Sequence, residues 1–195
     1  MRTEPEIVAA ALVAALDRLG VSYLVGGSIA SSVHGFARAT RDIDVVADLR
    51  VEQVSSLVAA LQEQFYIDAG MILDAIARRG SFNVIHLETL FKADVFIPGD
   101  TAYAAEEMSR RVLARLGPDL DSPQVSVASP EDTVLHKLLW FQAGRQISDR
   151  QWGDLVGVLK VQGRRLDREY LQRWSMELGI EDLLKGAMVE AGLEL

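Results

Sequence analysis

The sequence predicts an α+β fold, in which a mixed β-sheet is flanked by helices and extended by an all-helical C-terminal region. Through residues 1–128, short β-branched and aromatic runs interleave irregularly with amphipathic stretches, which favours a mixed sheet over a regular parallel one. From residue 129 onward, every apolar pattern has helical spacing. We therefore expect a core of residues 1–128 with a helical region of residues 129–195 packed on it.

Composition limits the class of protein. With 195 residues, 49% of them hydrophobic and 25% charged, the chain can bury a sizeable core without disulfides or structural metals. Its net charge of −8, from 20 basic and 28 acidic residues, opposes a broad surface for nucleic-acid phosphates but leaves a local basic groove open. The absence of cysteine excludes disulfides, thiolate zinc sites and cysteine nucleophiles.

The sequence also carries no pattern for membrane insertion or export. No apolar run approaches a membrane-spanning length, and the N-terminal segment MRTEPE lacks the layout of a signal peptide. We expect a cytoplasmic protein with no membrane partner.

Helices and strands alternate through the first half of the chain. Thr3 and Glu6 form a capping-box pattern that begins a helix ending near Gly20. Ser28 and Asp68 are expected to cap later helices. β-Branched and aromatic runs mark the strands, and residues 101–121 are expected to be less regular. The predicted strands are residues 21–25, 42–48, 65–67, 81–87, 91–98 and 125–127, and the predicted helices are residues 3–20, 29–34, 51–61 and 68–76.

Four further helices are predicted after residue 128. The segment SPED, which begins at Ser129, combines a cap, a proline and an acidic first turn. Ser148 begins a second capping-box pattern, and Asp167 and Glu181 begin the third and fourth helices.

Three aspartates interrupt apolar strands. Asp42 and Asp44 alternate along one strand, so their carboxylates point to the same face of the sheet, roughly 6.5–7 Å apart. This spacing suits two cations about 3.5–4 Å apart, as in two-metal phosphoryl-transfer sites. Asp94 offers a third carboxylate in another strand, and Lys92 lies on the same face of that strand. We predict a metal site at Asp42, Asp44 and Asp94, in preference to a role in solubilising the strand ends.

A glycine turn precedes the paired aspartates. Gly26 and Gly27 let backbone approach a ligand closely, and the helix that follows presents N–H groups and a positive dipole end to phosphate. Ser28 adds a hydroxyl. The segment is not a P-loop, because it lacks the required spacing and the lysine after the second glycine. We predict that these three residues contact a nucleotide, the alternative being a plain strand-to-helix turn.

The run from the apolar strand through Gly26-Gly27-Ser28 to Asp42-x-Asp44 resembles the DNA-polymerase-β-like nucleotidyltransferase superfamily. The resemblance implies the nucleotidyltransferase fold, with the paired acids binding two Mg²⁺ (or Mn²⁺) ions. It further implies that a third acid on a neighbouring strand, matched by Asp94, completes the site. Lys92 matches a Lys-x-acid motif of some subgroups.

The C-terminal half is similar to the abortive-infection type IV toxin nucleotidyltransferases and related uncharacterised prokaryotic proteins. Those proteins carry a helix lysine and a downstream helix aspartate, matched here by Lys137 and Asp154. The resemblance covers residues 21–156 and departs at Gln151, where that subgroup often has an acid. It implies a nucleoside triphosphate (NTP, for example ATP) as substrate, with a toxin–antitoxin or phage-defence setting and a partner antitoxin as hypotheses.

Four charged residues have both functional and simpler interpretations. Asp154 lies between two apolar stripes, so it is expected to be buried and to need a partner. The functional prediction assigns Arg38, Lys92 and Asp154 to nucleotide binding and Lys137 to catalysis as a phosphate counter-charge. The alternatives are a salt bridge for Asp154, a surface position for Lys137, a counter-charge to the acids for Lys92 and a solvated loop position for Arg38.

Together these residues predict an Mg²⁺-dependent nucleotidyltransferase. The hydroxyl of an acceptor (a tRNA end, a protein or a small molecule) would attack the α-phosphate of an NTP and release pyrophosphate. Asp42 and Asp44 would hold both metals, while Asp94 would bind the catalytic metal and help to activate the acceptor. The alternative is a non-catalytic nucleotide-binding or regulatory module on the same fold.

Overall fold

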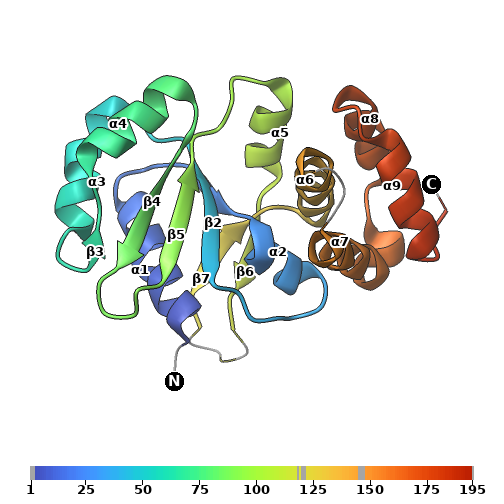
Figure 1. The fold of residues 1–195 in the computed structure, drawn as a ribbon, viewed down its shortest axis with the longest axis horizontal. Coiled ribbons are helices and arrows are strands. Elements are labelled where there is room, and N and C mark those ends of the chain that lie inside the picture. The colour runs from blue at the N-terminus through green and yellow to red at the C-terminus, as the bar shows by residue number, and fades with distance from the viewer. Residues whose placement is uncertain (1–2, 118, 120–121, 145–147, 195) are drawn as a thin grey trace. The chain divides into compact units, whose positions relative to one another are not determined.

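The computed structural model describes residues 3–117, 119, 122–144 and 148–194. The chain divides into two compact units. The sheet unit comprises Met1–Ile29 and Ala39–Val127, and the helical unit comprises Ala30–Arg38 and Ala128–Leu195. Figure 1 shows the elements of both.

The sheet unit contains, among its described residues, a seven-stranded mixed sheet. The strand order is β3-β4-β5-β2-β1-β7-β6. β2 runs parallel to β5 and β1 parallel to β7, whereas the other neighbours are antiparallel. The predicted α+β class and mixed sheet are therefore confirmed. The strands are β1 (Tyr23–Val25), β2 (Asp42–Ala47), β3 (Phe65–Tyr66), β4 (Ser81–His86), β5 (Lys92–Phe96), β6 (Val112–Arg115) and β7 (Gln124–Val127).

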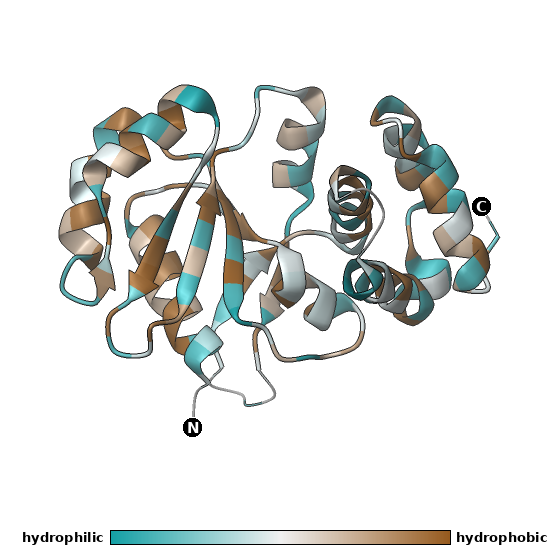
Figure 2. Cartoon of the chain, in the orientation of Figure 1, coloured by the Kyte–Doolittle hydropathy of each residue, from teal (hydrophilic) through white to brown (hydrophobic). Residues whose placement is uncertain are grey.

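Side chains along the central strands alternate between buried and half-buried positions. Figure 2 shows the matching alternation of hydropathy as bands along β2 and β5. On β2, Ile43, Val45 and Ala47 are fully buried, whereas Asp42 and Asp44 are half-buried. Helix α1 packs against β2 and α3, and α4 packs against β4. The helices before residue 111 are α1 (Glu4–Arg18), α2 (Gly27–His34), η1 (Val51–Gln53), α3 (Val54–Leu61), α4 (Ala69–Arg78) and α5 (Ala102–Arg110).

Two local predictions in the sheet unit are wrong. Residues 101–121 contain helix α5, capped by the Thr101 hydroxyl, and strand β6. Helix α5 buries Tyr103 and Glu107 and has few large apolar residues, and β6 is a mostly exposed edge strand, so neither shows the apolar run that marks the other elements. Helix α2 begins at Gly27, so Ser28 lies within its first turn and does not precede it as a cap. Pro118, Leu120 and Asp121 lie outside the described residues.

Capped helices build the helical unit. The side chains of Ser129, Ser148 and Asp167 each accept a hydrogen bond from the backbone N–H three residues on, which confirms the predicted helix starts. The helices are α6 (Pro130–Ala143), α7 (Asp149–Gln162), η2 (Gly163–Arg165), α8 (Arg168–Glu177) and α9 (Glu181–Glu190). No helix in the described part of the chain is long and apolar enough to cross a bilayer.

Residues 30–38 belong to the helical unit although they lie far from it in sequence. His34 Nε2 lies 2.7 Å from the Ala128 carbonyl oxygen, and the Gln162 side-chain amide donates to the His34 carbonyl at 2.6 Å. Phe36 packs over Gly157, and a Cβ built on Gly157 would lie 3.0 Å from the Phe36 ring. These contacts hold Arg38 near α7 within this unit.

Candidate functional site

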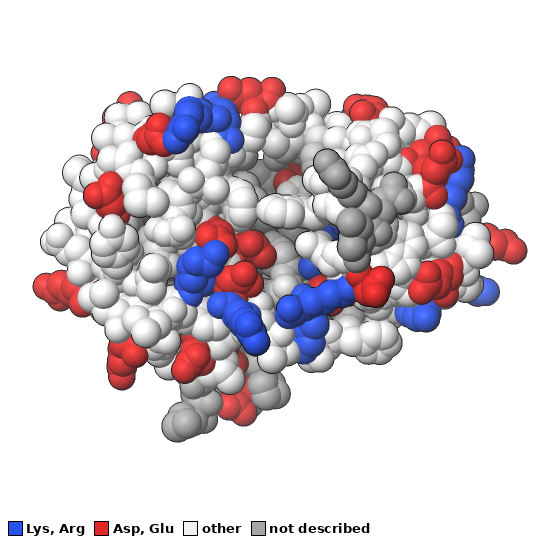
Figure 3. Space-filling model, viewed as in Figure 1, with Lys and Arg blue, Asp and Glu red and all other residues white. Residues whose placement is uncertain are grey.

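Four charged side chains form an array on one face of β2 and β5. The two strands run parallel, with Asp42 opposite Lys92 and Asp44 opposite Asp94. Neighbouring strands lie about 4.8 Å apart, and alternate residues share a face. All four residues are half-buried. Figure 3 shows acidic side chains gathered over these strands with basic side chains beside them. We call these four residues the carboxylate array.

Asp44 is fitted against the glycine turn. The Gly26 N–H donates to the Asp44 carbonyl at 2.8 Å. Gly27 has a φ of +55°, and a Cβ built on it would lie 1.7 Å from Asp44 Oδ2. Only glycine combines that backbone conformation with so close an approach. Gly26 has open space where its Cβ would be, so the two glycines have different structural roles.

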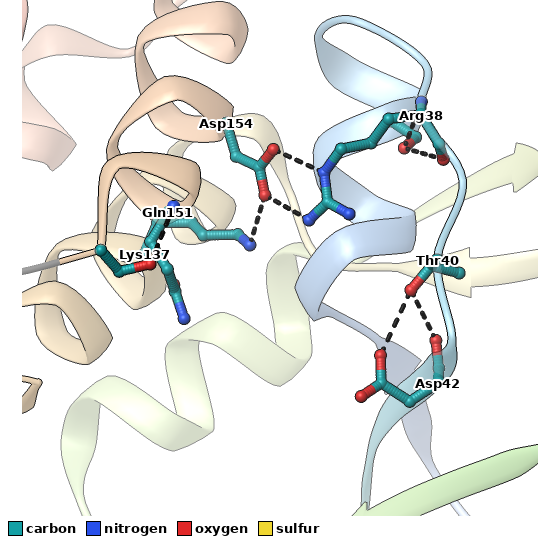
Figure 4. Close-up of polar contacts among 8 residues, drawn as sticks. Arg38, Thr40, Asp42, Lys137, Gln151 and Asp154 are labelled. Carbon is teal, nitrogen blue, oxygen red and sulfur yellow. Dashed lines mark hydrogen bonds and ion pairs between the residues drawn. The ribbon is translucent and has the colours of Figure 1, made fainter.

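Local partners hold the other two carboxylates. The Thr40 hydroxyl lies 3.2 Å from Asp42 Oδ1 and 3.0 Å from the Asp42 carbonyl oxygen (Figure 4). Lys92 Nζ lies 2.6 Å from Asp94 Oδ2. The hydrogen bond to Asp94 raises the pKa of the Lys92 amine; burial opposes this rise, and the negative charges of the three aspartates add to it. These contacts therefore stabilise the protonated, charged form of the Lys92 amine.

The donor atoms of the array are of the type that Mg²⁺ prefers, namely carboxylate oxygens. Their present arrangement is less suited to a metal ion. Among the residues that the structure describes, no group of three or more acidic, histidine or cysteine side chains is arranged to hold a metal. Asp94 faces Lys92, and Asp42 lies against Thr40. The carboxylates are suitable ligands for a divalent cation, but Asp42 and Asp94 would have to change their side-chain orientation to bind one.

A second charged cluster lies within the helical unit and is buried. Arg38 donates through Nε to Asp154 Oδ1 at 2.7 Å and through Nη2 to Oδ2 at 2.6 Å. Lys137 Nζ donates to Asp154 Oδ2 at 2.9 Å (Figure 4). The side chains of Asp154 and Lys137 are only 9% and 8% exposed, and that of Arg38 is 23% exposed. We call these three residues the cation clamp.

Two cations stabilise the charged form of Asp154. Burial raises the pKa of this carboxyl, but the hydrogen bonds from Arg38 and Lys137, together with their charges, outweigh burial and lower it. The sequence predicted that Asp154 would need a partner, and the structure supplies two. Lys137 is buried within the helical unit, so the alternative of a plain surface lysine is wrong. The solvated-loop alternative for Arg38 is also wrong, because its guanidinium is bidentate on Asp154.

The structure places the predicted residues in two groups. The sheet unit holds the carboxylate array and the glycine turn, and the helical unit holds the cation clamp. Sequence reasoning missed Thr40, although a threonine two residues before an aspartate is a recognisable pattern for local hydrogen bonding. The pairing of Arg38 with Asp154, 116 residues apart, has no local sequence signal.

No family model and no curated protein matches the sequence. The fold, however, is shared with solved structures. The antibiotic-resistance factor ANT(2″)-Ia, in its solution structure, matches with a TM-score of 0.57 and 14% identity over 92% of this chain and 95% of its own. The crystal structure of ANT(2″)-Ia with adenylyl-2″-tobramycin matches with a TM-score of 0.51 and 16% identity, over 90% and 98% of the two chains. The chain has a nucleotidyltransferase fold.

This finding confirms the nucleotidyltransferase fold predicted from the glycine turn and the paired acids. The lincosamide antibiotic adenylyltransferase LnuA, bound to lincomycin, matches with a TM-score of 0.48 and 12% identity, over 82% of this chain and 98% of its own. At these identities the likeness concerns the nucleotidyltransferase fold alone. The chemistry has to be argued from the residues.

Proposed function

We propose that this protein is a divalent-metal-dependent nucleotidyltransferase, which moves a nucleoside monophosphate from an NTP to an acceptor hydroxyl. The carboxylate array is the observation that carries the proposal. Asp42, Asp44 and Asp94 share one face of two adjacent parallel strands, and Gly27 closes against one of them. The array lies on a fold shared with ANT(2″)-Ia, which is described with an adenylylated antibiotic.

In this proposal, Asp42, Asp44 and Asp94 would hold the cation. The bound metal would supply charge neutralisation at the phosphates and at the attacking oxygen. The acceptor oxygen forms a bond to the α-phosphorus, the bond from that phosphorus to the bridging oxygen breaks, and pyrophosphate leaves. Asp94 accepts the hydroxyl proton. The protein thus acts by positioning and by charge, without a covalent intermediate.

The glycine turn is assigned to the phosphates, with a refinement for Gly26. Its N–H already donates to the Asp44 carbonyl, so Gly26 provides space for the ligand and not a hydrogen-bond donor. Gly27 and Ser28, at the start of α2, remain the candidate backbone and hydroxyl contacts.

The cation clamp supports an anionic ligand. Within the helical unit, Arg38 and Lys137 both donate hydrogen bonds to Asp154, so these contacts bring two cations to one carboxylate. We assign Arg38 and Lys137 to an anionic group such as a phosphate, and Asp154 to holding both cations in place. This assignment is independent of that of the carboxylate array.

For the acceptor, we favour a small hydroxylated molecule. ANT(2″)-Ia is described in complex with adenylyl-2″-tobramycin, a modified antibiotic. The net charge of −8 opposes a long nucleic-acid footprint. A tRNA end and a protein hydroxyl are the alternatives that the sequence leaves open, and a toxin–antitoxin setting rests on the sequence resemblance alone.

The direct test is incubation of the purified protein with each of four α-labelled NTPs, Mg²⁺ or Mn²⁺, and separate acceptors: tobramycin, a tRNA fraction and a small-molecule extract. We expect label transfer and pyrophosphate release with wild-type protein and none with Asp42→Asn or Asp44→Asn. Asp48→Asn, an exposed aspartate just beyond β2, is the matched control and should retain transfer. Absence of transfer from every NTP to every acceptor would argue against the enzyme.

A second function is favoured by one observation. The carboxylates are not arranged to hold a metal among the described residues, and Asp94 is paired with Lys92. A non-catalytic nucleotide-binding module would retain such an arrangement permanently. Binding of NTP without metal-dependent pyrophosphate release would identify it.

A further inference from the structure

Lys92 lies inside the carboxylate array, a position that nucleotidyl transfer does not by itself explain. Its ammonium contacts Asp94 Oδ2 at 2.6 Å, and in register it lies opposite Asp42 across the parallel strands. The residue thus places a positive charge among the three carboxylates that are assigned to the metal.

The array requires a cation in the absence of metal. Like charges placed side by side on adjacent strands destabilise a sheet, and Asp44 and Asp94 occupy the same register position. The ammonium of Lys92 compensates this repulsion.

We propose that Lys92 is an internal counter-cation, which holds Asp94 in the metal-free protein and releases it when a divalent cation binds. This inference rests on the proposed function, because it requires the array to bind a metal. It explains why Asp94 points to Lys92 and why no three-carboxylate group is arranged for a metal in the described part of the chain.

The exposure of the pair suits exchange of partners. The side chain of Lys92 is 42% exposed and that of Asp94 is 22% exposed. Ion pairs at such positions contribute little net stability, so a divalent cation can replace the ammonium at small cost. Lysine is a single charge on a flexible four-carbon stem, which lets it turn into solvent when the carboxylate is taken.

The first test compares Mn²⁺ binding without nucleotide, measured by the electron paramagnetic resonance signal of free Mn²⁺. Lys92→Gln removes the competing cation and should tighten Mn²⁺ binding about two- to fivefold. Lys92→Arg keeps a cation and should stay near wild type. Lys160→Gln, at an exposed position on α7, makes the same change in net charge and should have no effect.

A double-variant cycle assigns the effect to the pair. In an Asp94→Asn background, the carboxylate held by Lys92 is gone, so the additional change Lys92→Gln should tighten Mn²⁺ binding much less than it does in wild type. An equal tightening in both backgrounds would place the effect elsewhere and would overturn the proposal.

A third measurement uses the unaltered protein. Acylation of lysine amines, followed by peptide mass spectrometry, reports how fast each lysine reacts. Mg²⁺ should accelerate the labelling of Lys92 several-fold, because its ammonium is released from Asp94. The rates at Lys160 and Lys185 should stay constant. An unchanged rate at Lys92 at a Mg²⁺ concentration that saturates the protein would overturn the proposal, even if the variants fail to fold.

The remaining outcomes separate the two proposals. If wild type binds Mn²⁺ but Lys92→Gln binds it no more tightly, the inference fails and the proposed function stands. If Lys92→Gln instead weakens metal-free NTP binding, Lys92 is a phosphate ligand and the inference also fails. If wild type binds no Mn²⁺ at all, even with NTP, the metal-dependent function fails and the inference fails with it.

Discussion

The carboxylate array and the cation clamp have opposite charge and opposite exposure. The array sets three carboxylates against one lysine on a half-buried face of β2 and β5. The clamp sets two cations against one carboxylate, and the side chains of Asp154 and Lys137 are almost fully buried. The array therefore has more carboxylates than cations, and the clamp has more cations than carboxylates.

Exposure decides how each group behaves. The half-buried pair of Lys92 and Asp94 contributes little stability and can exchange partners. In the clamp, removal of one partner leaves a buried charge uncompensated, which is costly. We infer that the array is built for reversible binding, whereas the clamp keeps a fixed geometry. Changes in the array should affect activity most, and changes in the clamp should affect stability.

The largest effect is expected at the array. Asp42→Asn or Asp44→Asn should lower the rate of nucleotidyl transfer by about 100- to 1,000-fold or more, because the charge that stabilises the transition state is lost. Thermal unfolding should change little, since both side chains are half-buried. A large loss of stability with retained transfer would reverse the comparison between array and clamp.

The next effect concerns the clamp. Asp154→Asn should lower the free energy of unfolding by about 3 kcal/mol, because Arg38 and Lys137 lose their shared carboxylate. Chemical denaturation measures it. Asp182→Asn, at a fully exposed position on α9, serves as the control and should change stability little. If Asp154→Asn lowers the free energy of unfolding no more than the control does, the ion pairs of the cation clamp do not stabilise the helical unit.

The pH dependence of stability tests the same residue. The folded-state pKa of Asp154 lies below its ordinary value of 3.8, so its contribution is present above that pH and is lost as the pH falls through the lower, folded-state value. The difference in unfolding free energy between wild type and Asp154→Asn should be constant near neutrality and shrink as the pH falls below 3.8. A difference that does not change below that pH would contradict the assigned ion pairs.

The glycine turn offers a matched pair of variants. Gly27→Ala forces a Cβ into Asp44 at a positive φ and should cost at least about 1–2 kcal/mol in stability. It should also abolish transfer, because the Asp44 carboxylate must move. Gly26→Ala meets open space and should fold normally. Similar melting temperatures for the two variants would refute the close approach of Gly27 to Asp44.

The smallest effect is expected at Thr40. Thr40→Val removes the hydroxyl beside Asp42 and should cost about 0.5–1.5 kcal/mol in stability. Transfer should slow modestly as Asp42 loses its local partner, whereas Thr40→Ser should restore both properties. Steady-state kinetics and thermal unfolding of the two variants measure the effect. Equal behaviour of valine and serine would assign Thr40 to packing alone.

Much of the fold was predictable because its signals are local. The Ser129, Ser148 and Asp167 caps lie within three residues of the N–H groups they accept from, and each marked a helix correctly. Helix α5 and edge strand β6 were not predicted, because they bury few side chains and their sequences contain few large apolar residues.

The candidate site also has features that were predictable from local sequence and features that were not. The alternation of Asp42 with Ile43 and of Asp94 with Val95 already placed the acids on polar faces, because strand side chains alternate with a period of two. Their pairing across strands was not encoded locally. The order and register of β2 and β5, which set Lys92 opposite Asp42, depend on how the whole sheet assembles.

By itself, the sequence determined the α+β class, the glycine turn with its acids, and the helical C-terminal region, because each follows from spacing over a few residues. Only the tertiary structure decided that Lys92 holds Asp94, that Gly27 closes on Asp44, and that Arg38 joins Lys137 on Asp154. The last of these contacts joins residues 116 positions apart. A contact at such separation forms only after the chain has folded, so its partners leave no mark on each other's neighbourhoods in the sequence.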